Sequence, residues 1–164
     1  MINKNKNPLV GILMGSQSDW DVMKVAKDQL DDLGISSKEQ IISAHRTPNR
    51  ITDYAKKILK NNIKVIIAGA GGSAHLPGMM ASHTHIPVIG VPIESTCLNG
   101  IDSLLSIVQM PKGIPVATVS IGKTGAKNAA ILAAEILSIQ NEKIRNKLLS
   151  WKKIMSDNVP HEPK

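Results

Sequence analysis

Residues 38–60 of the chain read KEQIISAHRTPNRITDYAKKILK, and this stretch indicates the fold. A strand-like run at 38–42 leads into a short polar loop and then into a helix. Thr47 is a good N-cap for this helix, and Pro48 suits its first position, where a backbone N–H is not needed. Apolar residues then recur at helical spacing: Ile51, Tyr54, Ala55, Ile58 and Leu59. The stretch therefore predicts one strand–loop–helix unit.

The same alternation of strand and helix runs along the whole chain. The strands are expected at residues 9–14, 38–42, 65–68, 88–91 and 116–119. The helices are expected at residues 20–33, 48–60, 77–82, 103–109 and 126–140. Alternating units of this kind indicate a parallel sheet covered by helices on both faces. We therefore predict a flavodoxin-like three-layer α/β/α sandwich, whose ligand crevice lies at the carboxyl ends of the strands.

The length of 164 residues fits a single domain with a proper core. We expect this domain to have its core at about residues 8–140, followed by a helical extension at about residues 141–164. The extension carries a narrow apolar stripe on an otherwise charged helix, formed by Ile144, Leu148, Trp151 and Met155. Such a stripe predicts packing on another subunit, and packing back on its own domain is the alternative.

The amino-acid composition limits the kinds of molecule that the protein is expected to bind. The formal net charge is +7, but aromatic residues make up only 2% of the chain and Phe is absent. A base-stacking platform for nucleic acid is therefore not expected, and the diffuse positive charge suits a small anionic substrate. The single cysteine, Cys97, excludes an internal disulfide and agrees with a reducing compartment. No apolar run approaches the roughly 20 residues of a membrane span. We expect a cytoplasmic protein that binds neither nucleic acid nor membrane.

The loop that follows the second expected strand carries His45 and Arg46. A histidine there can exchange a proton near neutral pH, and the arginine can hold an anion. The alternative is a loop histidine beside a surface arginine. The loop after the first strand, residues 15–19, reads GSQSD. Its glycine, hydroxyls and N–H groups can bind an anion, although Ser18 could instead cap the next helix together with Asp21.

The loop after the third strand, residues 69–78, reads GAGGSAHLPG. So many glycines suggest a backbone that lies against a ligand, although tight packing could also require some of them. We interpret His75 as a histidine that bonds the backbone and holds this loop, and a catalytic role is the alternative. In a flavodoxin-like strand order the first and third strands are neighbours, so these loops should converge.

Two pattern matches suggest other sites. Residues 117–124 satisfy a relaxed phosphate-loop pattern, but residues 117–121 are rich in β-branched side chains and indicate a strand rather than an open loop. The segment Gly69-x-Gly71-x-x-Ala74, with Glu94 about 20 residues further on, is a dinucleotide-binding candidate. The helix after it looks too short, and the pattern leaves Ser16 and His45 unexplained. The other histidines and the single cysteine form no metal-ligand pattern.

Taken together, these loops closely resemble one family, the 5-(carboxyamino)imidazole ribonucleotide mutases of de novo purine synthesis. The resemblance spans about residues 10–137. It rests on the segments GSQSDW at 15–20, SAHRTP at 43–48, GAGGSAHLPGM at 69–79, PVIGVP at 87–92, GIDSLLSIVQMP at 100–111 and GIPV at 113–116. The departures, Cys97, Asn99, Thr124 and Lys127, fall outside these segments.

The resemblance implies a mutase that moves a carboxylate from an exocyclic nitrogen to a neighbouring ring carbon of a phosphorylated ribonucleotide. It implies a homo-octamer, and it implies no metal, nucleotide cofactor or ATP. His45 would be the general acid and base, and Arg46 would take the phosphate. The substrate-binding set that the resemblance implies is Ser16, Ser18, Asp19, Ser43, Arg46, Ala70, Gly71, Ser73, His75 and Leu76.

Three other functions stay open at this point. A related enzyme of similar fold carboxylates the aminoimidazole directly with carbon dioxide, and sequence alone does not separate it from the mutase. A dinucleotide-dependent oxidoreductase would use Gly69–Ala74 and respond to NAD. A non-catalytic receiver or binding domain of the same fold would bind ligand without turnover.

Overall fold

A five-stranded parallel sheet forms the centre of the structure, a computed structural model that describes residues 7–58 and 61–163. The strand order is β2-β1-β3-β4-β5. The strands are β1 (Val10–Met14), β2 (Ser37–Ile41), β3 (Val65–Gly71), β4 (Val88–Ile93) and β5 (Ala117–Thr118). In this order β1 and β3 are neighbours in the middle of the sheet, and all four strand pairs are parallel.

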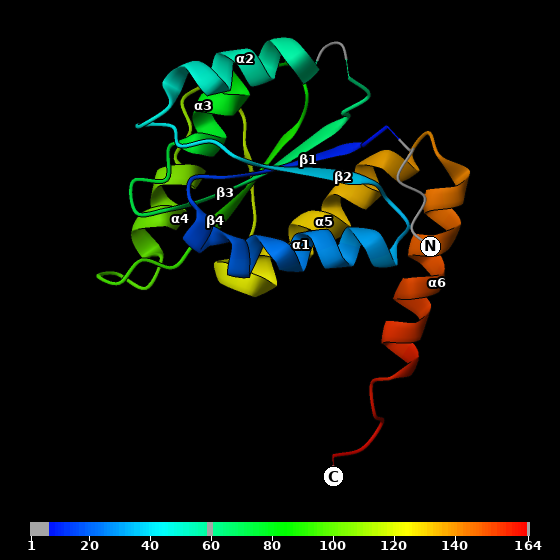
Figure 1. Ribbon diagram of the computed structural model, residues 1–164. Coiled ribbons are helices and arrows are strands. Elements are labelled where there is room, and N and C mark those ends of the chain that lie inside the picture. The colour runs from blue at the N-terminus through cyan, green and yellow to red at the C-terminus, as the bar shows by residue number, and fades with distance from the viewer. Residues whose placement is uncertain (1–6, 59–60, 164) are drawn as a thin grey trace.

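Helices cover both faces of the sheet (Figure 1). One face packs against α1 (Trp20–Asp32) and α5 (Gly122–Ser138), and the other against α2 (Pro48–Ile58), α3 (Leu76–Ser82) and α4 (Ile101–Val108). A short 3-10 helix, η1 (Gln17–Asp19), precedes α1. The side chains between the sheet and its helices form two buried apolar clusters, one on each face. The expected three-layer α/β/α architecture is therefore confirmed.

Burial explains the order of the strands. Every residue of β1 and β4 is buried, as expected for strands with helices on both faces. By contrast, β2 is a partly exposed edge strand with the polar sequence SKEQI. The other edge, β5, pairs over only two residues, so the strand expected at 116–119 is shorter than predicted.

Two elements extend further than sequence periodicity indicated, and each contains a glycine that lies close to a neighbouring segment. Helix α5 begins at Gly122 rather than at residue 126, and in its first turn a Cβ on Gly125 would clash with the carbonyl oxygen of Ser120. Strand β3 continues to Gly71, and a Cβ on Gly69 would clash with the sulfur of Met23 in α1. These glycines permit close approach of neighbouring elements.

The last two residues expected in α2, Leu59 and Lys60, lie outside the described residues.

The C-terminal helix α6 (Glu142–Asp157) packs in part on its own domain. Its N-cap Asn141 accepts a hydrogen bond from the backbone N–H of Ile144 through Oδ1, at 3.1 Å. Ile144 and Leu148 are buried in the core cluster that contains α5, and Trp151 packs against it. The core therefore continues beyond residue 140, and own-domain packing holds for the first half of the predicted stripe.

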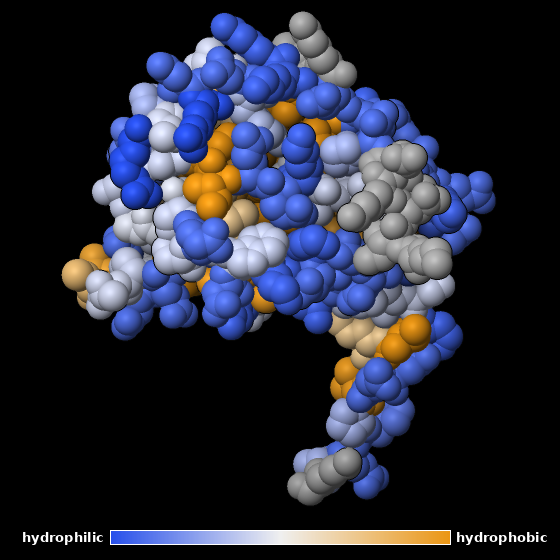
Figure 2. All heavy atoms as spheres, in the orientation of Figure 1, coloured by the Kyte–Doolittle hydropathy of each residue, from blue (hydrophilic) through white to orange (hydrophobic). Residues whose placement is uncertain are grey.

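The second half of α6 projects beyond the body of the molecule (Figure 1). Figure 2 shows apolar side chains along this projecting part, where Ile154 and Met155 are 61% and 53% exposed. Within residues 7–58 and 61–163, no helix is long and apolar enough to cross a bilayer.

Candidate active site

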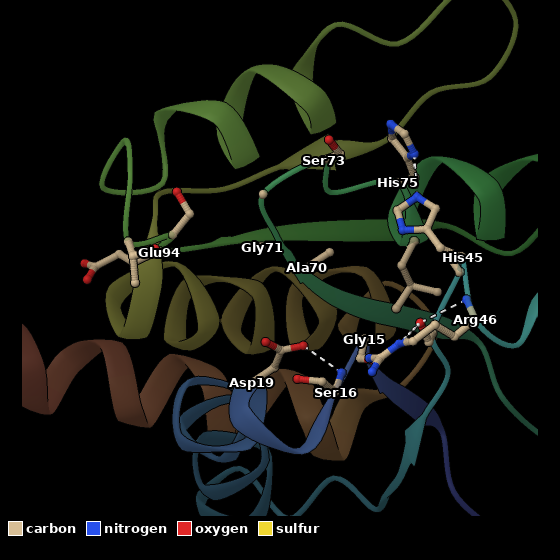
Figure 3. Close-up of a pocket in the computed structure, with 16 residues that line it drawn as sticks. Gly15, Ser16, Asp19, His45, Arg46, Ala70, Gly71, Ser73, His75 and Glu94 are labelled. Carbon is tan, nitrogen blue, oxygen red and sulfur yellow. Dashed lines mark hydrogen bonds between the residues drawn. The ribbon is translucent and has the colours of Figure 1, made fainter.

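A cavity of about 500 Å³ opens at the carboxyl ends of β1, β2, β3 and β4 (Figure 3). The loops that follow these strands therefore converge, as expected for this fold. All the site residues expected from the sequence line this cavity except Ser18. They are Ser16, Asp19, Ser43, His45, Arg46, Ala70, Gly71, Ser73, His75 and Leu76.

The loop after β1 is closed by a reciprocal contact between Ser16 and Asp19. The backbone N–H of Ser16 donates to Asp19 Oδ2 at 2.9 Å, and the Ser16 carbonyl accepts from the Asp19 backbone N–H at 3.3 Å. This pair starts η1, so capping here is made by Ser16 and Asp19 instead of the Ser18 and Asp21 pair considered above. Ser18 reaches the site indirectly, because its hydroxyl lies 2.5 Å from the hydroxyl of Ser16.

The Asp19 carboxyl group is half-buried, and burial raises its pKa above the ordinary value of 3.8. Hydrogen bonds from the backbone of Ser16 and Gly15, and the positive charge of Arg46, act in the opposite direction. Burial is the larger effect, because a carboxylate loses more favourable hydration than these groups replace.

The loop after β2 holds Arg46 between two elements. The hydroxyl of Ser43 accepts from the Arg46 backbone N–H at 3.3 Å and from its side-chain Nε at 3.0 Å. The Nη2 atom of Arg46 donates to the carbonyl of Gly15, after β1, at 3.3 Å. Thr47, directly before α2, donates through its hydroxyl to the Ser43 carbonyl at 2.9 Å. An exposed guanidinium is thus held at the mouth of the cavity.

His45 and His75 face one another across the cavity wall (Figure 3). The Nε2 atom of His45 lies 2.8 Å from Nδ1 of His75, and the rings are nearly perpendicular at 79°. The prediction that the His75 side chain bonds to the backbone is therefore wrong for its Nδ1 atom, which bonds to the His45 ring instead. One ring must donate and the other accept, so the bond sets the tautomer of each ring relative to the other.

The end of β3 gives the site a wall of backbone. Ala70 is buried, while Gly71 and Ser73 are exposed to the cavity. Gly72 has φ +62, and an added Cβ there would meet nothing within 4 Å. The space beside this turn is therefore free for a planar or charged ligand to lie against the main chain.

The same geometry argues against a dinucleotide site. Gly69 and Gly71 belong to β3 itself, and the helix that follows, α3, has seven residues. In a dinucleotide-binding fingerprint, by contrast, the glycines lie in the turn between the strand and a long helix, and the N-terminus of that helix binds the pyrophosphate.

The cavity also contains residues that the sequence analysis did not assign to it. Glu94, Ser95 and Thr96 follow β4 and line the cavity, and Glu94 lies on the side opposite His45 and Arg46 (Figure 3). Ser95 donates through its hydroxyl to Asp102 Oδ1 at 2.8 Å, which ties this loop to the start of α4. The signal that could have identified these three residues is their position directly after the apolar strand β4, which is a neighbour of β3 in the sheet. Among the described residues no group of three or more His, Cys, Asp or Glu side chains could hold a metal ion.

Comparisons with known proteins show what the chain as a whole is similar to. The family model described as AIR carboxylase matches residues 9–158. The chain is 61% identical over 141 residues to the N5-carboxyaminoimidazole ribonucleotide mutase of Bacillus subtilis, covering 86% of this chain and 87% of that protein. It is 48% identical over 163 residues to the mutase of Escherichia coli, covering 99% and 96%. The crystal structure of Treponema denticola PurE superposes with a TM-score of 0.84 at 32% identity, covering 92% of each chain.

Proposed function

The chain belongs to the AIR carboxylase family, and we propose that it interconverts 5-(carboxyamino)imidazole ribonucleotide and 4-carboxy-5-aminoimidazole ribonucleotide in de novo purine synthesis. The observation that carries this proposal is the identity of 48–61% to mutases across most of the chain. The cavity agrees with it, because it combines a cation for a phosphate, a titratable imidazole and an open backbone wall.

The reaction moves a carboxylate between neighbouring atoms. We propose that an acid in the site protonates the exocyclic nitrogen as the bond from this nitrogen to the carboxylate carbon breaks, which releases carbon dioxide and leaves a neutral, electron-rich aminoimidazole. The ring carbon then attacks carbon dioxide and forms the new carbon–carbon bond. This carbon must next lose its proton to restore the aromatic ring. A base that is active near neutral pH is therefore required at this position.

His45 is the residue that we propose for this proton transfer. Its imidazole lies in the cavity and is held by His75, so one ring nitrogen is oriented while the other can face the substrate. The hydrogen bond between the rings persists when the pair gains one proton, because one ring still accepts, and it is lost when both rings are protonated. The pair can therefore give one proton to the exocyclic nitrogen when carbon dioxide leaves, and take up the proton of the ring carbon when the product forms.

The remaining residues would bind the substrate. Arg46 and the hydroxyls of Ser18 and Ser43 are proposed to receive the phosphate, and Asp19 to accept from the ribose hydroxyls. The turn at Gly71–Ser73 would lie against the base and its carboxylate. Ser16, Ala70, His75 and Leu76 complete the walls.

An isotope experiment separates the mutase from a direct carboxylase. The protein is given 5-(carboxyamino)imidazole ribonucleotide labelled with ¹³C in its carboxylate, in unlabelled bicarbonate, and the product is analysed by mass spectrometry. Retention of the label supports the mutase, because a closed site recaptures its own carbon dioxide. Product formed only from aminoimidazole ribonucleotide and dissolved carbon dioxide would contradict the mutase and identify a direct carboxylase.

We further propose that the chain assembles as a homo-octamer in the cytoplasm. Two apolar surfaces support assembly. The first lies on and beside α4, where Leu98, Ile101, Leu105 and Val108 are each about half exposed. The second runs from the middle of α6 to just beyond its end and contains Leu149, Ile154, Met155 and Val159. Soluble monomers seldom keep apolar surfaces of this kind in water.

A further inference from the structure

The orientation of Arg46 is fixed before any ligand binds. An exposed arginine side chain ordinarily samples many rotamers, and ordering it on binding costs free energy. Here the side chain makes hydrogen bonds to two different elements, the Ser43 hydroxyl after β2 and the Gly15 carbonyl after β1. The guanidinium therefore bridges the two loops in a single orientation.

Ser43 holds Arg46 from one side. Its hydroxyl oxygen accepts from both the backbone N–H and the side-chain Nε of Arg46, at 3.3 and 3.0 Å. These contacts occupy the lone pairs of the hydroxyl, and they turn the guanidinium back over its own loop. Removing the hydroxyl would release the Nε end of the guanidinium.

Asp19 acts on Arg46 from the other side, through one peptide unit. The carbonyl of the Gly15–Ser16 peptide accepts from Arg46 Nη2 at 3.3 Å, and the N–H of the same peptide donates to Asp19 Oδ2 at 2.9 Å. The peptide dipole lies between a cation at its oxygen and an anion at its N–H. Both charges favour this orientation, so Asp19 fixes the carbonyl that receives Arg46.

We propose that Ser43 and Asp19 are positioning residues that hold the Arg46 guanidinium in the orientation that receives the substrate's phosphate. This inference rests on the phosphate role proposed for Arg46. Within the described residues the Nη1 atom of Arg46 makes no hydrogen bond to protein, so its N–H groups stay available for an anion. Ser43 and Asp19 thereby lower the ordering cost of binding.

A double-mutant cycle tests the inference with ribose 5-phosphate as a competitive inhibitor. Arg46→Ala, Ser43→Ala and Asp19→Ala are made singly, and each of the last two is combined with Arg46→Ala. We expect Ser43→Ala to weaken inhibition roughly tenfold in the natural background, the size of a lost charge-assisted hydrogen bond. In the Arg46→Ala background the same change should have a clearly smaller effect, because no guanidinium remains to be positioned, and any residual effect reports the direct contact proposed between the Ser43 hydroxyl and the phosphate. Asp19→Ala should show the same coupling, with any residual effect reporting a ribose contact.

The conservative variants sharpen the test. Ser43→Thr keeps the hydroxyl, so ribose 5-phosphate should inhibit this variant nearly as strongly as the natural protein. Asp19→Asn keeps an acceptor for the Ser16 N–H but loses the negative charge, so its inhibition should lie between that of the natural protein and that of Asp19→Ala. Ser150→Ala on α6 controls for loss of an exposed serine hydroxyl outside the cavity. Full additivity of Ser43→Ala and Arg46→Ala would overturn the inference, because Ser43 would then act only through its own contact with the phosphate and not through Arg46. Unchanged inhibition in Arg46→Ala alone would instead overturn the phosphate role of Arg46.

Discussion

His45 Nε2 lies 2.8 Å from His75 Nδ1, which links the loop after β2 to the segment after β3. These two strands are separated by β1 in the sheet, so the contact crosses the mouth of the cavity above the β1 loop. A loop histidine that is held in this way keeps one ring nitrogen in a fixed direction. Orientation of the ring, and not only its presence, is therefore part of the proposed chemistry.

We expect His45→Asn to abolish turnover while leaving substrate binding nearly intact. The variant removes the proposed proton acceptor, a loss of about 10²- to 10⁴-fold in turnover rate. Single-turnover kinetics and equilibrium binding of the product measure the two effects separately. His83→Asn, at an exposed histidine in the loop after α3, is the matched control and should behave as the natural protein. Turnover near the natural rate in His45→Asn would contradict the assignment.

His75→Asn should have a smaller effect than His45→Asn. The amide can still offer one hydrogen-bonding group to His45 but cannot hold a proton. We expect a lower kcat, a changed pH dependence of kcat and an almost unchanged KM. The full pH profile is the measurement. If His75→Asn keeps both the kcat and the pH profile of the natural protein, the imidazole pair is not used in the reaction.

The layers of the fold could be predicted from the sequence, because alternating strand and helix patterns depend on local periodicity. The site loops at Ser16, His45 and Ser73 could also be predicted, since each follows a strand. The Glu94–Thr96 wall was not assigned, because its place depends on which strands are neighbours. Likewise the His75 ring partner lies 30 residues away in the chain, and no local pattern indicates it.

Tertiary packing explains the remaining differences between the predicted and the observed elements. The start of α5 depends on Gly125 lying against the Ser120 carbonyl, a contact between backbone atoms that helix periodicity does not describe. Similarly, Ile144 and Leu148 on α6 are buried in the core cluster that also contains residues of α1 and α5. The apolar stripe predicts that α6 is covered, but which part is covered by its own domain follows only from the tertiary structure.

Arg46→Ala should mainly weaken substrate binding. The variant removes a charge-assisted contact to the phosphate worth roughly 1.5–3 kcal/mol, so KM should rise by about one to two orders of magnitude. The change in kcat should be smaller, because the guanidinium is not proposed to act on the ring carbon. Steady-state kinetics measure both constants. An unchanged KM would count against the phosphate role.

Asp19→Asn should stabilise the fold at neutral pH and impair substrate binding. Burial raises the pKa of Asp19 above its unfolded value of 3.8, so the folded protein holds the proton more tightly than the unfolded chain does. The ionised carboxylate therefore costs stability above that raised pKa, and the cost disappears as pH falls toward and below 3.8. The gain in melting temperature should be present at pH 7 and fade in acid. Equal gains at both pH values, or a loss at pH 7, would contradict this account.

The final prediction concerns the projecting half of α6. Deleting everything after Gln140 would also remove Ile144 and Leu148 from the core, so loss of stability there would not report on assembly. The double variant Ile154→Ser/Met155→Ser changes only exposed side chains and leaves the packed half of α6 in place. If these side chains are buried between subunits, the variant should form smaller particles in light scattering and keep its helical circular dichroism signal.

A matched control uses the same helix. Lys143→Ser/Asn146→Ser alters two exposed polar side chains near the start of α6, and its particle size should not change. The assembly variant should also lose activity if neighbouring subunits help to enclose the cavity, because carbon dioxide would then escape before recapture. That loss should be smaller in saturating bicarbonate, which replaces the escaped gas. An octamer of unchanged size in the Ile154→Ser/Met155→Ser variant would show that this surface is not an assembly contact.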